Sequence, residues 1–446
     1  MQGGGWCLSE KDCLSRSKGD LGTSKQYTKD KTAEEMEGQS GAMVRNSTTN
    51  PQMHDWNHVW IKYCDGNSFT GANASTTKAS DGSTLFWRGS LILDAAIESL
   101  LANPLSPLSA ATDVVVGGGS AGGLATFIHC VRPPHLAPSI PVLSNRAPRR
   151  QDRWAQHFTP SKTHYVCLAD SGFFLDYDGP PKYGDGMRWA YQQQNSSAGV
   201  QRECLAHYEP SGEGWRCNFA QYTASFAKAP LFARQSTYDA WQSGNILGSK
   251  APGPMNAFGA NLTRLIEGSL LRQKQHAVFL DSCFHHCALW DQIRIDGQLV
   301  HQAFWAWYNG SSAEAKLEQR KPYPCAECCK PDRDHAASAR RQLRLKTTDR
   351  RASEARPLWL DAAQGVEARL AALLPTLSVE QLAAQTEHLW TTVSMAKLLA
   401  TYNKTGAGAS YIAHPTGNAT CDSDPPCNLE ARLKANRALM ASCGIP

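Results

Sequence analysis

The sequence has no apolar run of the ~20 residues that a membrane-spanning helix needs. Neither sign of charge is in large excess, since the formal net charge of the 446 residues is +5. Lys and Arg are scattered apart from a cluster between Arg333 and Arg356, which Asp334, Asp349 and Glu354 interrupt and which we interpret as a solvated linker. These absences favour a protein with no membrane span and no nucleic-acid partner. The N-terminus, MQGGGWCLSE, also lacks the basic start and apolar stretch of a signal peptide.

Cysteine, by contrast, is abundant, with 15 residues. Several lie in close pairs, which suggests metal ligands or disulfides: Cys7 and Cys13, Cys204 and Cys217, Cys283 and Cys287, and Cys421 and Cys427. N-x-Ser/Thr sequons favour disulfides formed on a secretory route, and they occur at Asn46, Asn73, Asn195, Asn261, Asn309, Asn403 and Asn418. We therefore predict a secreted glycoprotein of the extracellular space or cell wall, with Cys7–Cys13 and Cys204–Cys217 as disulfides. The odd number leaves at least one cysteine without an intramolecular partner.

Up to Cys329, short β-branched runs alternate with helical patterns, which indicates an α/β fold. Residues 86–105 carry an apolar helical stripe, made of Leu91, Leu93, Ala96, Ile97, Leu100 and Leu101. Strands are predicted at 113–116, 164–170, 229–235 and 276–280, with a helix over 122–130. Polar residues follow these strands, and in open α/β sheets the chemistry gathers at the carboxyl ends of strands.

The composition changes after residue 330. Residues 331–356 are charged and loop-like, residues 357–402 are rich in Ala and Leu at helical spacing, and the tail predicts a loop and a short helix. We therefore divide the chain into a main domain, residues 1–330, and a charged linker with a helical C-terminal extension, residues 331–446, whose role the sequence does not indicate.

The stretch GGGSAGGL, residues 117–124, follows the apolar run 114–116 directly and fits the G-x-S-x-G nucleophile elbow. Side chains at Gly118 and Gly122 would clash with the neighbouring strand and helix, and the turn exposes the Ser120 hydroxyl at a helix N-terminus that favours an oxyanion. A purely structural glycine turn and a dinucleotide-binding loop are alternatives. The second lacks the acidic residue expected ~20 residues further on.

A serine nucleophile needs a base and an acid, which in this fold class follow in the order Ser, Asp or Glu, His. Asp239 comes just after one predicted strand, and His285 and His286 come just after the next. Asp170 and Asp176 are alternative acids. His129 is interpreted as a packed helix residue, and zinc binding by Cys283, His285, His286 and Cys287 remains an alternative that lacks a second Cys-rich ligand group.

Seven motifs in order resemble the plant-type pectin acetylesterase family, which also includes the animal lipid-removing esterase Notum. They are GGGWC (3–7), YCDGNSFTG (63–71), GGGSAGGLATFIHC (117–130), CLADSGFFLD (167–176), YDAWQ (238–242), SCFHHC (282–287) and PYPCAECC (322–329). The resemblance implies an α/β-hydrolase-like fold with a mostly parallel sheet flanked by helices. The sequence departs from the family pattern before the glycine loop, where Met1 and Gln2 stand in place of an expected strand segment. We interpret this departure as a start site placed too late.

The resemblance implies a catalytic serine at Ser120, the acid at Asp239 and the base at His286, because the family motif reads like SCFAHC and places His285 at the alanine position. It also implies an oxyanion hole from the amides of Ala121, Gly4 and Gly5. No metal or organic cofactor is needed. We predict a monomeric, secreted serine carboxylesterase that removes acetyl groups from cell-wall polysaccharide such as pectin.

Hydrogen-bonding and aromatic residues near the predicted site favour sugar acetates over fatty-acyl esters. We expect Asp65 and Trp241 to contact the sugar, together with Asn67, Ser68, Tyr238 and Gln242; for Tyr238 and Trp241 the alternative is a place in the core. Two other functions stay open: a Notum-like fatty-acyl carboxylesterase, and a catalytically inactive glycan-binding relative.

Overall fold

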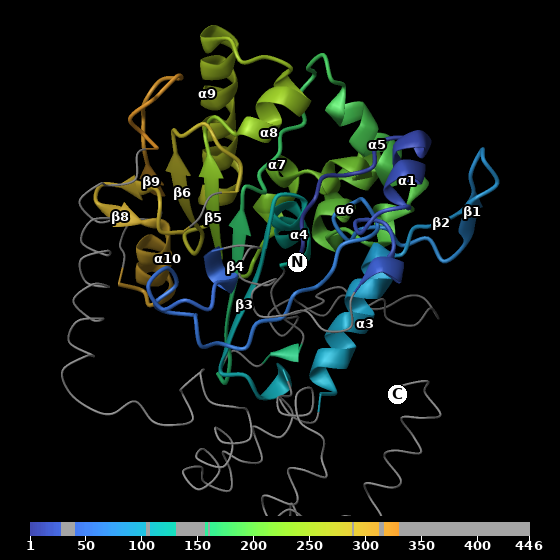
Figure 1. Cartoon of the computed structure of the whole chain (residues 1–446), viewed down its shortest axis with the longest axis horizontal. Helices are drawn as coiled ribbons and strands as arrows, with labels where there is room; N and C mark the ends of the chain where they lie inside the picture. Colours follow the sequence, from blue (N-terminus) through green and yellow to red (C-terminus); the bar gives the residue numbers. More distant parts are fainter. Residues whose placement is uncertain are drawn as a thin grey trace, which may run out of the picture. The chain divides into compact units, whose positions relative to one another are not determined.

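A five-stranded parallel sheet forms the centre of the main domain, with strand order β3-β4-β5-β6-β9 (Figure 1). The computed structural model describes residues 1–27, 41–103, 108–130, 157–158, 161–287, 290–311 and 316–329. The predicted extension 331–446, with Cys421 and Cys427, lies outside the described residues. The α/β-hydrolase-like fold class with its parallel sheet is confirmed.

The elements have the following bounds. The strands are β1 Thr76–Lys78, β2 Thr84–Phe86, β3 Asp113–Gly119, β4 His164–Asp170, β5 Leu231–Ser236, β6 Ala277–Asp281, β7 Arg294–Ile295, β8 Gln298–Leu299 and β9 Lys316–Glu318. The α-helices are α1 Glu10–Arg16, α3 Gly89–Leu101, α4 Ala121–His129, α5 Tyr183–Gln193, α6 Arg202–Tyr208, α7 Ala220–Thr223, α8 Ala240–Gln242, α9 Pro252–Gly268 and α10 Val300–Tyr308. All four predicted strands and the helix over 122–130 are present, with ends shifted by at most a few residues.

Both faces of the sheet are covered, so its strands are apolar almost throughout. Alternate residues of β6 divide between two clusters: Val278 and Leu280 pack with α4 and α9, whereas Ala277 and Phe279 pack with Phe304 of α10. This alternation follows from the two-residue period of a strand. Sandwiching the sheet between helices fixes its position and leaves its carboxyl edge to the loops that carry the polar motifs.

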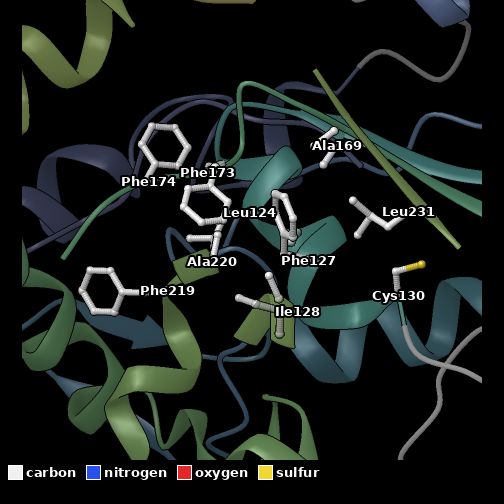
Figure 2. Packing of buried hydrophobic residues seen from close by; sticks show 14 of the residues in the cluster. Leu124, Phe127, Ile128, Cys130, Ala169, Phe173, Phe174, Phe219, Ala220 and Leu231 are labelled. Atoms are coloured by element: carbon white, nitrogen blue, oxygen red, sulfur yellow. The ribbon is translucent and has the colours of Figure 1, made fainter. Parts of the chain in front are cut away.

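Helix α4 is buried along its whole length, with Leu124, Phe127 and Ile128 at its centre. Figure 2 shows these side chains against Phe173 and Phe219, which come from the loop after β4 and from the segment before α7. A burial of this kind contributes roughly 1.5–3 kcal/mol for each large apolar side chain. The helix that follows Ser120 is therefore a rigid support.

The elbow glycines are required by close approach, as predicted. A Cβ at Gly118 would lie 2.4 Å from the Gly122 carbonyl oxygen, and one at Gly122 would lie 2.3 Å from the Met1 carbonyl oxygen. The prediction was inexact about the neighbour, because the segment packed on Gly122 is Met1–Gln2 rather than a strand of the sheet.

The predicted apolar stripe of α3 is only partly buried. Leu93 and Ile97, four residues apart, are buried, but Leu91 is 45% exposed. Leu91 lies off the buried face of the helix, because only residues that repeat every three to four positions can point inward together. The 17-residue helix α9 follows that rule and buries Met255, Phe258, Leu262 and Ile266.

The disulfides Cys7–Cys13 and Cys204–Cys217 are confirmed. Three more pairs are present: Cys130–Cys167, Cys283–Cys329 and Cys325–Cys328. Within the described residues Cys64 and Cys287 are unpaired. In the same part of the chain, no helix has the length and apolar character needed to cross a bilayer.

Candidate active site

Ser120 sits at the junction of β3 and α4 in a strained backbone conformation, with φ 58° and ψ −124°. Such a positive φ is uncommon for a residue with a side chain and is held here by surrounding contacts. The Ser120 N–H donates to the Asp170 carbonyl at 2.9 Å. The glycine loop lies against it, since a Cβ at Gly3 would be 3.0 Å from the Ser120 Cβ. These are the features expected of a nucleophile elbow.

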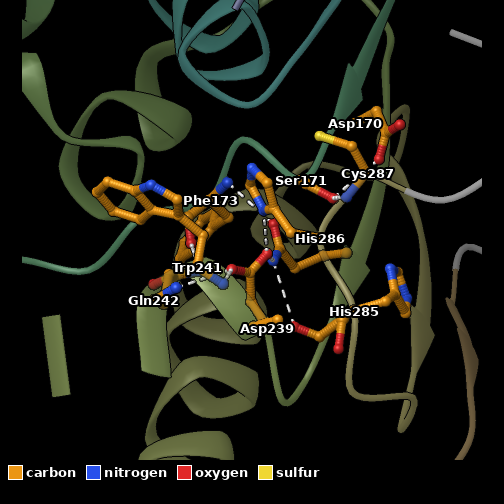
Figure 3. A network of polar contacts seen from close by, with 12 residues as sticks. Asp170, Ser171, Phe173, Asp239, Trp241, Gln242, His285, His286 and Cys287 are labelled. Atoms are coloured by element: carbon orange, nitrogen blue, oxygen red, sulfur yellow. Dashed lines mark hydrogen bonds and ion pairs between the residues drawn. The ribbon is translucent and has the colours of Figure 1, made fainter. Parts of the chain in front are cut away.

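Asp239 and His286 form a pair after β5 and β6, in which Asp239 is buried and His286 is partly buried (Figure 3). The His286 Nδ1 lies 2.8 Å from Oδ2 of Asp239. The other carboxylate oxygen, Oδ1, accepts the N–H groups of Trp241 and Gln242 at 3.0 and 2.9 Å and so caps α8. The cap fixes the carboxylate, and the remaining oxygen orients the imidazole.

The loop that carries His286 passes next to the elbow. A Cβ at Gly119 would lie 3.5 Å from the Cys287 Sγ, so the chain neighbours of Ser120 and His286 face each other. The His286 Nε2 is buried and makes no hydrogen bond to any described residue. With Nδ1 on Asp239, Nε2 is the nitrogen left for a proton exchange.

Opposing effects act on the imidazole. Burial lowers the pKa of His286, but the hydrogen bond to Asp239 and the charge of that carboxylate outweigh it and raise this pKa above its ordinary value of 6.5. Burial also raises the pKa of the Cys287 thiol, and the Asp170 charge adds to the effect. The thiol is therefore neutral at neutral pH.

The alternative acids and the second histidine have other partners. Asp176 binds Arg188 and Tyr222, at 3.3 and 3.0 Å. Asp170 binds the buried Arg234 at 3.1 Å, and His285 lies 2.9 Å from Asp281. In Figure 3 the His285 ring points away from Asp239. Of the acids considered, the one paired with His286 is Asp239.

His129 is a buried residue of α4, as the sequence predicted. Its Nε2 lies 3.1 Å from the Ser68 carbonyl oxygen. The zinc alternative is wrong for the set proposed, because Cys283 is bound covalently to Cys329.

Of the predicted oxyanion residues, Ala121 follows Ser120 directly, and Gly4 and Gly5 follow Gly3, which packs against Gly119 and Ser120. Ala121 is the first residue of α4, where helix geometry leaves the N–H without an intrahelical acceptor. Gly4 and Gly5 have φ values of 131° and 69°. The Gly4 carbonyl accepts from Arg16 at 2.9 Å, and because a trans peptide is planar, the Gly5 N–H points to the opposite side.

The loop at residues 65–68 is scaffold, contrary to our expectation. Asp65 is buried and accepts the backbone N–H groups of Asn67, Phe69 and Gly71, each at 3.1 Å. Asn67 and Ser68 are fully buried, and the Ser68 hydroxyl donates to the Ala121 carbonyl at 2.8 Å. Their polar groups are used to order the loop, so Asp65, Asn67 and Ser68 are not placed to bind a sugar.

Tyr238 and Gln242 are also internal. The Tyr238 hydroxyl donates to Asn256, and the Gln242 side chain bonds the backbone of residues 173 and 175. The core alternative therefore holds for Tyr238.

Trp241 is only half-buried, and its ring centre lies 6.4 Å from that of His286. Its ring also packs edge-on against Trp6 and Phe174, with 5.3 Å between ring centres in each case. These three rings form an aromatic wall; Trp6 and Phe174 were not predicted as site residues. Trp241 is the one proposed sugar contact that reaches the candidate site.

Residues 1–330 match the family model described as Pectinacetylesterase, which is about three quarters of the chain. The chain belongs to the pectinacetylesterase family. It is thus a member of a group of carboxylic ester hydrolases.

Among curated relatives, this pectinacetylesterase family member is 27% identical to pectin acetylesterase 5 of Arabidopsis thaliana over 74% of its own length and 75% of the relative. It is 25% identical to the palmitoleoyl-protein carboxylesterase NOTUM of Schmidtea mediterranea, over 72% of this chain and 58% of that protein. The solved structure of the Wnt deacylase Notum from Drosophila superposes with a TM-score of 0.58 at 23% identity, covering 74% of this chain and 88% of the other. The structural likeness establishes the α/β-hydrolase-like fold.

Proposed function

We propose that this pectinacetylesterase family member is a secreted serine esterase that removes O-acetyl groups from cell-wall polysaccharide, with Ser120, His286 and Asp239 as its triad. One observation carries the proposal: His286 is paired with Asp239 at 2.8 Å, and the loop that carries His286 faces the strained Ser120 elbow. The Arabidopsis relatives, which are pectin acetylesterases, support the acetyl ester as substrate.

In the proposed reaction the His286 Nε2 takes the Ser120 hydroxyl proton while Oγ attacks the acetyl carbonyl carbon. The tetrahedral oxyanion accepts hydrogen bonds from the amides of Ala121, Gly4 and Gly5. The bond to the sugar oxygen then breaks, that oxygen receives the proton from His286, and acetyl-Ser120 remains. Water attacks this ester with His286 again as base, which releases acetate and restores the serine. Asp239 stabilises the imidazolium throughout.

The Cys287 thiol lies beside the same imidazole and is the obvious competing nucleophile. Its raised pKa leaves it in the neutral form, which is a poor nucleophile. Ser120, in addition, stands at a strained elbow directly before helix α4. The serine is the better candidate on both grounds.

The aromatic wall supports a small acyl group. Trp6 and Phe174 are buried and contact each other at 4.7 Å between ring centres, and Trp241 closes the group next to His286. A long acyl chain directed to this side would have to displace packed rings. The Notum-like relatives keep a fatty-acyl substrate as the second candidate.

The test measures acetate release from acetylated polysaccharides, and hydrolysis of p-nitrophenyl esters from acetyl to palmitoyl, by the full chain and its Ser120→Ala variant. We expect acetate release that the variant loses, with catalytic efficiency highest for the shortest acyl groups. Efficiency rising beyond about eight carbons, each methylene contributing ~0.8 kcal/mol in an apolar pocket, would assign the fatty-acyl function. Tight polysaccharide binding without hydrolysis of any ester would assign the glycan-binding function.

A further inference from the structure

A buried group of charges lies under the candidate triad but is not part of it. Arg234 of β5 bonds Asp170 at 3.1 Å and lies 3.5 Å from Asp281 of β6, and all three side chains are almost fully buried. The ends of β4, β5 and β6 are thereby joined by ion pairs as well as by the sheet. Burial opposes the charge on Arg234, but Asp170 and Asp281 raise its pKa, so it remains a cation.

Ser171 connects this group to the loop that carries the base. Its hydroxyl donates to the Asp170 Oδ1 at 3.0 Å and accepts from the Arg234 guanidinium at 3.2 Å. The same oxygen also accepts the backbone N–H of Cys287 at 3.0 Å (Figure 3). Ser171 is fully buried and holds a φ of +49°, which is costly for a residue with a side chain.

His286 is held by a backbone bond on each side. On one side the His285 carbonyl accepts the N–H of Ala240, which follows Asp239. On the other side the Cys287 N–H donates to the Ser171 hydroxyl. The second tether is the one made by a side chain, so a substitution can remove it without touching the triad.

We propose that Ser171 is a positioning residue for the ester hydrolysis: its hydroxyl, oriented by Asp170 and Arg234, holds the chain at Cys287 so that His286 faces Ser120. Asp170 serves both partners, because its carbonyl accepts the Ser120 N–H while its carboxylate orients Ser171. Asp170, at the end of β4, thus helps to position both the nucleophile and the base. The inference rests on the proposed function, since it assigns the alignment of that same site.

The test compares Ser171→Ala and Ser171→Gly with the unmodified chain. Both variants remove the hydroxyl, but glycine adopts a positive φ without strain, so it separates the loss of the bond from a backbone effect. A buried hydroxyl bonded elsewhere supplies the matched control, Thr223→Val, because the Thr223 hydroxyl bonds Gln201 at 3.2 Å. For each chain we would measure kcat and KM on p-nitrophenyl acetate, the rate at which a fluorophosphonate labels Ser120, and the melting temperature.

Misalignment of a general base costs on the order of 10- to 100-fold in rate. We expect kcat and the labelling rate to fall by that factor in both Ser171 variants, with KM within about two-fold and Thr223→Val unaffected. The inference is overturned if either Ser171 variant keeps its kcat, or if the loss disappears when rates are normalised to the folded fraction. If Ser120→Ala itself retains activity, the proposed triad fails instead, which separates the two conclusions.

Discussion

The Ser120 hydroxyl and the His286 imidazole act as one unit in the proposed reaction, because neither transfers the proton alone. Ser120→Ala or His286→Ala should therefore lower kcat on p-nitrophenyl acetate by several powers of ten. His285→Ala should reduce it by less than about ten-fold, because His285 contacts Asp281 and Arg234 rather than Asp239. Steady-state kinetics on the three purified variants would check this, and a greater loss from His285→Ala than from His286→Ala would reverse the assignment.

The pH dependence of the reaction should follow the charge on His286. The base must be neutral, and its pKa is raised above 6.5, so kcat/KM should increase with pH through a midpoint above 6.5 and be lost below it. Asp239→Asn removes the carboxylate that raises the pKa of His286, so the burial of the imidazole, which lowers this pKa, is no longer opposed by that charge. The midpoint should then move to lower pH while kcat falls by about 10⁴-fold, as a triad without its acid does.

A matched change tests whether the shift is specific. Asp176→Asn alters a carboxylate bound to Arg188 and Tyr222 and should leave the midpoint in place. An Asp239→Asn enzyme with an unmoved midpoint would contradict the assignment of that limb to His286.

Sequence reasoning succeeded at residues whose role depends on local spacing. The surrounding glycines predicted the role of Ser120. The positions of Asp239 and His286 directly after predicted strands, which the structure contains, predicted theirs. It failed at Asp65 and Asn67 because a polar residue in a loop can equally order that loop or bind a ligand, and only burial decides between the two uses. Ser171 gave no local signal, since its importance comes from a contact with Cys287, which is 116 residues away.

At the scale of elements, His276 joins the start of β5 to the loop before β6. Its Nδ1 accepts the Leu231 N–H at 3.2 Å, so Nε2 carries the proton and donates to the Ala227 carbonyl at 2.9 Å. Burial lowers the pKa of His276 to about 4, against the raising effect of the bond to Ala227. A second proton on the ring would break the bond to Leu231.

This histidine should make the fold sensitive to acid. The unfolded chain binds the proton from about pH 6.5 downward and the folded chain only near pH 4, so the stabilisation is complete above 6.5 and is lost as pH falls through that window. The difference amounts to at most about 3 kcal/mol. Guanidinium unfolding at pH 7.5 and 4.5 should show a smaller decrease in unfolding free energy for His276→Gln than for the unmodified chain. Equal decreases would show that other groups cause the acid sensitivity.

The strands were predictable as elements because both sheet faces are covered, which makes each strand a continuous apolar run bounded by polar residues. The buried face of α3 was harder to predict from the sequence. Its sequence is apolar at Leu91, Leu93 and Ile97 alike, and the choice among faces is made by the partner rather than by the helix itself.

On the scale of the whole molecule, the disulfides supply stability that a peptide map can check. Cys204 and Cys217 close a loop with a sequence separation of 13, and removing such a cross-link costs about 3 kcal/mol. The double variant Cys204→Ala, Cys217→Ala should melt at a lower temperature and keep its kcat. A map without reduction should return this pair and Cys7–Cys13, and free thiols at all four positions would contradict a secretory origin.

The Cys283–Cys329 disulfide makes the order of synthesis matter to this protein. Cys283 leaves the ribosome 46 residues before its partner, whereas Cys287 follows it after four residues and has no disulfide within the part of the chain that the structure describes. The next thiol to emerge after Cys283 is therefore the wrong one, and a bond between them would close a ring around His286. A thiol exchange must undo any such ring after the last strand has emerged, so the yield of active esterase should depend on the isomerase activity of the compartment that folds it.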